Sequence, residues 1–184
     1  MEKQYQNIHQ DLIDRCQKGD TRAQFEIYKV YYKPMYNVCL RMVGNAVEAE
    51  DVMQEAFLRA FTKLDTYEGV VSFGAWLKKI VINRSLDFLK KRKVKFEEIN
   101  EKIPDEEPEQ LVISEIHMET LKKAIYQLSD GYRVVLTLYL LEGYDHEEIA
   151  QILGITNVSS RSQYMRAKQK LRELLKKEEV FEYN

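Results

Sequence analysis

The chain has 184 residues, a length that suits one ordinary domain or two small domains joined by a linker. It contains 7 glycines and 3 prolines, against about 13 and 9 for average usage, so turns are scarce and helices should dominate. This composition argues against a large α/β enzyme, while 45% hydrophobic and 32% charged residues allow a buried core with a charged surface.

Hydropathy and cysteine content indicate the compartment. The longest nearly apolar run covers residues 134–141, far short of the roughly 20 residues that cross a bilayer, and the first ten residues show no signal-peptide pattern. We therefore expect a soluble, cytoplasmic protein. Cys16 and Cys39 form no CxxC pair, which favours two reduced thiols and neither a disulfide nor a metal site.

The net charge of −2 conceals three segments of different charge. Residues 1–95 have an excess of bases, residues 96–119 hold one lysine against nine acids, and residues 120–184 are nearly balanced. The middle segment also holds two of the three prolines, so we expect a flexible acidic linker between two small helical domains. Bases cluster again within 76–95 and 161–177, which indicates polyanion contacts, with solvated basic faces as the alternative.

Apolar spacing predicts four helices in the first domain. The first covers about residues 8–16, the second about Thr21 to Val43, the third about Val47 to Leu64 and the fourth about Phe73 to Lys91. The stripe expected to be buried on the second helix, with a kink at Pro34, is Phe25, Tyr28, Tyr32, Met35, Tyr36, Cys39, Leu40 and Val43.

The second domain shows the pattern of a helix-turn-helix. After two apolar helices, residues 145–156 read as a capped helix that ends in a turn at Gly154, and another helix follows through Leu175. The small Ala150 lets the two helices approach each other. The outer face expected for the last helix carries Arg161, Gln163, Arg166, Lys168 and Lys170. Such a helix can enter a DNA major groove, and a plain αα-hairpin is the alternative.

Three segments together resemble one known family. Residues 49–61 and 73–91 resemble the core-binding and minus-ten regions of extracytoplasmic-function (ECF) sigma factors, the compact sigma-70 class, and residues 166–171 resemble their minus-thirty-five reader. The resemblance implies an all-α, non-catalytic initiation factor with no cofactor and no small-molecule substrate. Its implied partners are core RNA polymerase, through the clamp helices and the flap, promoter DNA and an anti-sigma factor. The implied domains are 1–95 for core binding and minus-ten melting and 120–184 for minus-thirty-five recognition.

A polar face on the third helix carries the implied docking surface for the clamp helices. Its residues are Asp51, Gln54 and Glu55. Asp51 and Glu55 are four residues apart, so both carboxylates lie on one face and can pair with arginines while Gln54 hydrogen-bonds beside them. The alternative is a solvated acidic stripe.

The loop 65–72 and the helix after it carry the implied minus-ten contacts. Tyr67 and Phe73, with Asn83, form an aromatic and amide set that can hold an unstacked base, whereas Trp76 is assigned mainly to packing. The implied contacts are Tyr67, Phe73, Lys78, Lys79, Asn83, Arg84, Asp87, Lys90 and Lys91.

The last helix carries the implied minus-thirty-five contacts. They are Arg161, Ser162, Gln163, Arg166 and Lys168. The family has a buried Val or Ile early in this helix, where this sequence has Ser160, and Gln163 stands where Arg is common.

Readings from other functional classes explain less of the sequence. Residues 146–150 begin like the zinc-protease motif HExxH but end in Ala150, and no phosphate-binding glycine motif occurs, so we expect no enzyme and no metal. A ligand- or phosphorylation-controlled regulator that binds duplex DNA through the helix-turn-helix, without polymerase, leaves the N-terminal motif of residues 49–61 and 73–91 unexplained. A protein-binding helical adaptor leaves both basic clusters unexplained.

Overall fold

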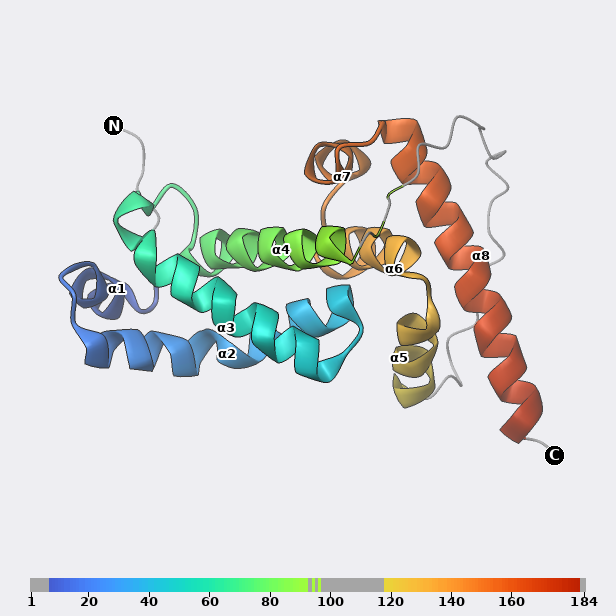
Figure 1. Cartoon of the computed structure of the whole chain (residues 1–184), viewed down its shortest axis with the longest axis horizontal. Coiled ribbons are helices and arrows are strands. Elements are labelled where there is room, and N and C mark those ends of the chain that lie inside the picture. The colour runs from blue at the N-terminus through green and yellow to red at the C-terminus, as the bar shows by residue number, and fades with distance from the viewer. Residues whose placement is uncertain (1–6, 93, 95, 97–117, 183–184) are drawn as a thin grey trace. The chain divides into compact units, whose positions relative to one another are not determined.

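The computed structural model describes residues 7–92, 94, 96 and 118–182, with side chains up to 177. All regular structure within these residues is helical, which confirms the expected all-α fold (Figure 1). The chain divides into two compact units, Met1–Arg92 and Lys93–Asn184. The acidic linker expected at 96–119 lies outside the described residues apart from 96, 118 and 119.

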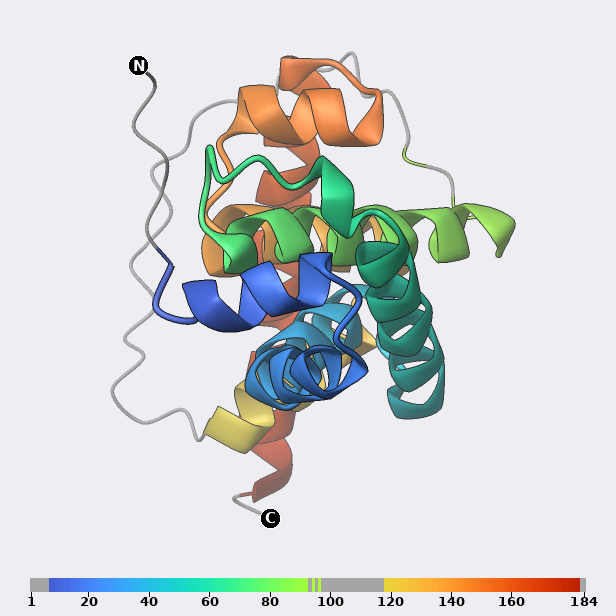
Figure 2. The ribbon, with the colours of Figure 1, turned by 90° about the vertical axis from the view of Figure 1, so that its left-hand side faces the viewer.

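The first unit is a bundle of four α-helices and one short 3₁₀ turn. α2 packs against both α3 and α4, and α1 packs against α2 (Figure 2). The elements are α1 (Gln10–Gln17), α2 (Thr21–Val43), α3 (Ala46–Thr62), η1 (Leu64–Thr66) and α4 (Phe73–Lys91). The bounds expected for the second and fourth helices are confirmed.

Side-chain caps define where these helices begin. The carboxylate of Asp20 accepts hydrogen bonds from two backbone amides at the start of α2, and Asn45 does the same for α3. Ser72 Oγ accepts from the backbone N–H of Ala75 at the start of α4. At the other end of α2, Gly44 adopts φ +80°, a left-handed conformation that glycine reaches without strain.

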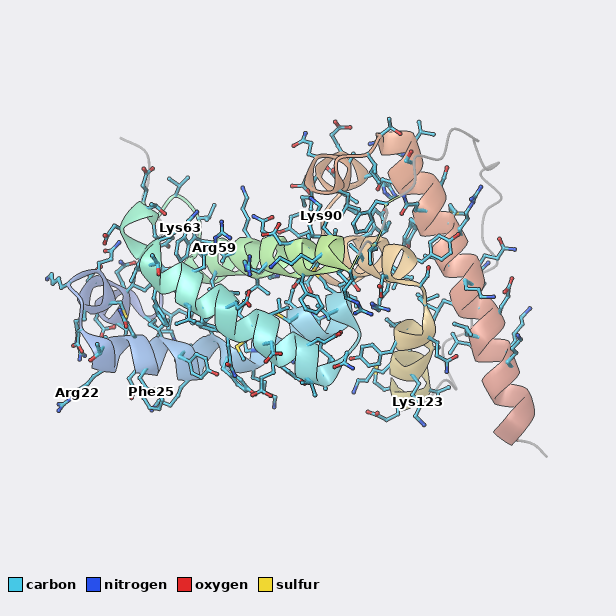
Figure 3. All side chains as sticks on the ribbon, in the orientation of Figure 1. Arg22, Phe25, Arg59, Lys63, Lys90 and Lys123 are labelled. Atoms are coloured by element: carbon cyan, nitrogen blue, oxygen red, sulfur yellow. The ribbon has the colours of Figure 1, made fainter. Side chains whose placement is uncertain are left out.

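The stripe expected on α2 needs one correction. Phe25 is 60% exposed and projects from the helix beside Arg22 (Figure 3), with Lys29 over its ring. Ile27 is buried in its place, and two residues along a helix turn its side chain by about 200°, so Phe25 and Ile27 lie on nearly opposite faces. The residues of α2 that enter the core are Ala23, Ile27, Met35, Val38, Cys39, Met42 and Val43.

Both cysteines are free thiols within this core. Burial raises the pKa of Cys39 to about 12 and that of Cys16 to about 11. Both sulfurs are therefore protonated at neutral pH and act as small apolar groups.

The second unit forms its core where α5, α6 and α8 meet. Its elements are α5 (Met118–Gln127), α6 (Asp130–Leu136), the π-helical turn η3 (Thr137–Leu141), α7 (His146–Leu153) and α8 (Asn157–Glu182). The core cluster is Ala124, Leu128, Leu136, Ala167, Leu171 and Leu175. Arg133 is buried beside it, where its guanidinium donates to the carbonyl of Leu128 at 2.9 Å and pairs with Asp130, so its charge is satisfied.

Candidate nucleic-acid interface

The outer face of α3 is polar in the middle and apolar at both ends. Asp51, Gln54 and Glu55 are all exposed, as expected from their spacing. Leu58 is 69% exposed, and Val47 is also exposed; both lie on this face at helical spacing from Asp51. We call these five residues the α3 face. Sequence reasoning missed Leu58 and Val47, although neither fits the apolar stripe that α3 buries.

An ion-pair network joins α3 to α4 beside this face. Glu55 pairs with Arg84, Arg84 reaches Asp87 at 3.4 Å, and Asp87 lies 4.0 Å from Arg59. Two residues assigned to DNA contact, Arg84 and Asp87, are therefore partners of each other, and Arg84 is also the partner of Glu55, a residue assigned to polymerase contact. Their carboxylates and guanidinium fix α3 against α4.

Around the start of α4, three aromatic rings pack on one another. The centroids of Tyr67, Phe73 and Trp76 are 5.4 Å apart in each pair. Tyr67 and Phe73 are buried, so their rings support the loop and the helix and do not line an open pocket for a base. Asn83 is exposed on the face of α4 that carries Trp76, about two helical turns further along.

The basic side chains of α4 lie mainly in its outer surface. Lys79, Lys90 and Lys91 are exposed, Lys78 is half-buried, and Figure 3 shows Lys90 projecting from the helix. A row of this kind can hold phosphates without reading bases.

The helix-turn-helix has the caps that its sequence indicates. Asp145 and Glu148 form a reciprocal capping box at the start of α7, which ends at Gly154 with φ +69°. Ile149 and Ala150 are buried on α7, which packs against α8. The expected small residue and glycine turn are thus confirmed.

A buried polar contact links α7 to α8. Ser160 is buried, and its Oγ lies 2.9 Å from Nδ1 of His146. The imidazole stacks on Tyr139, with centroids 4.4 Å apart, and lies near Tyr164. Burial lowers the pKa of His146 below 6.5, the charge of Arg161 lowers it further, and Asp145 opposes both.

The residues assigned to minus-thirty-five contact do not share one face. Arg161 is exposed, and its Nε donates to Oδ1 of Asn157 at 2.9 Å. Lys168 Nζ lies over the ring of Tyr164, and both Lys168 and Arg166 are half-buried.

Gln163 is 3% exposed, so its expected position on the outer face of α8 is wrong. Ser162, which is also assigned to minus-thirty-five contact, is buried as well. Gln163 follows Ser160 by three residues and precedes Ala167 by four, which puts it on the inner stripe. The same spacing was visible in the sequence and would have placed it correctly.

Comparison with known proteins identifies the family. Sigma-70 region 2 matches residues 27–94, and Sigma-70 region 4 matches residues 118–171. The chain is 30% identical over 178 residues to the ECF RNA polymerase sigma factor SigW of Bacillus subtilis, an alignment that covers 89% of this chain and 95% of SigW. This chain belongs to the ECF sigma factor family. It is also 31% identical over 177 residues to the RNA polymerase sigma-H factor of Pseudomonas aeruginosa, covering 89% of this chain and 92% of that protein.

Solved structures resemble this ECF sigma factor in fold. The sigma factor RpoE of Bartonella quintana, in complex with the anti-sigma factor NepR, matches with a TM-score of 0.56 and 24% identity over 82% of this chain and 95% of that one. CnrH in complex with the cytosolic domain of CnrY matches with a TM-score of 0.52 and 21% identity, over 90% of this chain and 95% of that one.

None of the helices that the structure describes combines the length and the apolar character of a membrane span. Within the same part of this sigma factor, no three His, Cys, Asp or Glu side chains gather as a metal site would require.

Proposed function

We propose that this sigma factor docks on core RNA polymerase through the α3 face, opens the minus-ten element with the 67–72 loop and α4, and reads the minus-thirty-five element with α8. The observation that carries the proposal is the occurrence of both sigma regions in family order along one chain. A DNA-binding regulator that acts without polymerase would need only the second region.

The α3 face has the chemistry of a protein-docking surface. Asp51 and Glu55 supply charges of one sign and Gln54 supplies an amide, while Val47 and Leu58 supply apolar contact at the ends. Burial of these exposed apolar side chains against a protein partner would remove their surface from water and so favour association. Arginines on the clamp helices would complement the carboxylates.

Asn83 is our candidate for contact with an extruded minus-ten base. Its side chain is exposed, and a primary amide offers both a donor and an acceptor to a base edge. Lys79, Lys90 and Lys91 on the same helix would hold the backbone of the opened strand. The burial of Tyr67 and Phe73 supports a role behind the loop, and Arg84 and Asp87 serve to hold α4 in place.

Arg161 is our candidate for reading a minus-thirty-five base. It lies in the first turn and a half of α8, where the second helix of a helix-turn-helix meets base edges. Lys168 and Arg166 lie further along and would contact phosphates. We withdraw Ser162 and Gln163 from the contact set because their side chains are buried.

The remaining assignments follow from the sigma-factor role. We assign core binding and minus-ten melting to residues 1–95 and minus-thirty-five recognition to 120–184, with 96–119 as the connection. An anti-sigma factor is a further partner, because the similar RpoE was solved in complex with the anti-sigma factor NepR, and the similar CnrH in complex with the cytosolic domain of CnrY. The flap of core polymerase is the other expected contact. The protein itself catalyses nothing and acts in the cytoplasm, where polymerase and promoters are.

Reconstitution with purified core RNA polymerase tests the proposal. The protein should bind core with one-to-one stoichiometry and direct transcription from a pool of random promoters, and the selected templates should share two elements with a fixed spacing. Tight binding to duplex DNA in the absence of core, without transcription in its presence, would instead support the polymerase-independent regulator.

A further inference from the structure

We propose that Asn7 is a positioning residue for minus-ten recognition, which holds the 67–72 loop and the first turn of α4 in place. Asn7 lies outside every helix and is only 8% exposed. Its amide joins two residues that are 60 and 66 positions away in the sequence. The inference rests on the proposed role of this loop and of α4 in the melting of the promoter.

The amide nitrogen of Asn7 fixes the loop through Tyr67. Nδ2 donates to Tyr67 Oη at 2.9 Å, and to Oε1 of Gln10 at 2.8 Å. Tyr67 Oη in turn donates to the carbonyl of Val71 at 2.7 Å. A continuous chain of hydrogen bonds therefore crosses the loop, and each group in it uses its proton once.

The amide oxygen of Asn7 fixes the start of α4. Oδ1 accepts from the backbone N–H of Phe73 at 2.7 Å. Phe73 is the first residue of α4, and its N–H has no partner within the helix. Ser72 caps the amide of Ala75, so Asn7 supplies from outside the helix the acceptor that the first amide needs.

A second side chain from the N-terminal region also holds this loop through hydrogen bonds. Nε2 of Gln17, the last residue of α1, donates to the carbonyls of Leu64 and Tyr67, both at 3.3 Å. The loop thereby presents Val70 and Val71 outward, where both are exposed. Since a helix transmits the orientation of its first turn along its length, the bond to Phe73 also sets where Asn83 lies.

The test compares Asn7→Ala and Tyr67→Phe with Asn37→Ala, an Asn-to-Ala change at an exposed site on α2 of the same unit. The three measurements are affinity for purified core polymerase, base preference at each minus-ten position in a promoter pool, and amide hydrogen exchange of residues 67–73. Asn7→Ala should reduce preference at one or more minus-ten positions by about fivefold to tenfold, the size expected for one lost hydrogen bond. Its core affinity should match wild type, and the Phe73 amide should exchange faster.

Tyr67→Phe separates positioning from folding. It removes the hydroxyl in the middle of the chain and keeps the ring that packs on Phe73 and Trp76. Tyr67→Phe should reproduce part of the loss of minus-ten base preference seen in Asn7→Ala. The double variant should lose less base preference than the sum of the two single losses. Asn37→Ala should match wild type in all three measurements.

The outcomes distinguish this inference from the proposed function. Wild-type preference and wild-type exchange in folded Asn7→Ala would overturn the inference alone. Should Asn7→Ala fail to fold, wild-type preference in Tyr67→Phe would overturn it instead. A wild-type protein that does not bind core would overturn the proposed function, and the exchange measurement would still decide whether Asn7 fixes the loop.

Discussion

The guanidinium of Arg84 on α4 is paired with the carboxylate of Glu55 on α3. The pair joins a helix assigned to DNA contact with a face assigned to polymerase contact. The side chain of Arg84 is mostly buried and that of Glu55 is mostly exposed, so the Glu55 carboxylate remains accessible to a protein partner. The α3 face and α4 are thus joined by a pair of opposite charges.

Exchange of the two charges separates the structural role of Glu55 from its docking role. Glu55→Arg and Arg84→Glu alone should each lower the free energy of unfolding by up to about 1 kcal/mol, because each leaves like charges together at a partly exposed site. The double variant should recover part of that stability in thermal melts, because the exchanged pair is again of opposite charge while the carboxylate at position 84 lies beside Asp87. Its affinity for core should stay as low as that of Glu55→Arg, because the docking face has lost its carboxylate.

Asp51→Asn is the matched control for this experiment, since Asp51 lies on the α3 face one helical turn before Glu55. It should weaken core binding and leave the melting temperature unchanged. Recovery of core affinity in the double charge-exchange variant would mean that Glu55 acts only through Arg84.

Replacement of Asn83 tests the contact with a minus-ten base. Asn83→Ala should relax preference at one minus-ten position by about 1–3 kcal/mol, the value of one amide contact to a base edge. Stability should not fall, because the side chain is exposed and alanine favours a helix. Lys79→Ala is the control, and it should weaken all promoters alike. A base-preference profile for Asn83→Ala that matches wild type at every position would remove Asn83 from the site.

Three variants of α8 should each affect a different property: base preference, affinity for all promoters, or stability. Arg161→Ala should reduce base preference at one minus-thirty-five position. Lys168→Ala should weaken binding to all promoters alike, and the slope of log binding constant against log salt concentration should fall in magnitude by about one. Gln163→Ala should leave base preference intact and destabilise the second unit by about 1–3 kcal/mol, because it removes a polar side chain that is buried in the folded unit. A change of preference in Gln163→Ala would show that this side chain leaves the core when DNA binds.

The stability of the second unit should depend on the protonation of His146. The folded-state pKa of His146 lies below 6.5, so the unfolded chain binds the proton more readily than the folded one. The contribution of neutral His146 to the free energy of unfolding is therefore fully present above about pH 6.5. Stability should fall as the pH drops from there toward the folded-state pKa, with a slope of at most about 1.4 kcal/mol per pH unit. Thermal melts between pH 8 and pH 5 measure this dependence.

The control for the pH measurement is His146→Gln, which keeps a polar side chain and removes the titration. Its melting temperature should vary less than that of wild type between pH 8 and pH 5. An equal pH dependence in both proteins would assign the effect to other groups.

The sequence allowed the helices to be predicted well because their ends carry local signals. Asp20, Gly44 and Ser72 mark where α2 and α4 begin or end, and each acts on residues within one turn. Buried faces were harder, because large aromatic side chains also occur at the edge of a core. The buried stripe predicted for α2 therefore includes Phe25, whereas it is Ile27 that enters the core.

Contacts between residues distant in the sequence could not be predicted. The bond from Asn7 to Phe73 spans 66 positions and has no periodicity, and nothing in the sequence pairs Glu55 with Arg84. The sequence predicted the polar residues of the α3 face from their spacing but not its apolar ones. The exposure of Leu58 depends on where the other helices pack.

The contact between His146 and Ser160 restricts rotation of α8 about its own axis. Each residue step along a helix corresponds to about 100° of rotation, and aliphatic packing tolerates part of such a turn, whereas a hydrogen bond to one ring nitrogen does not. The angle at which Arg161 leaves the helix is therefore fixed by a bond in the interior. With α8 in the major groove as we propose, substitutions on its outer surface would change which bases it contacts without changing the angle of the helix.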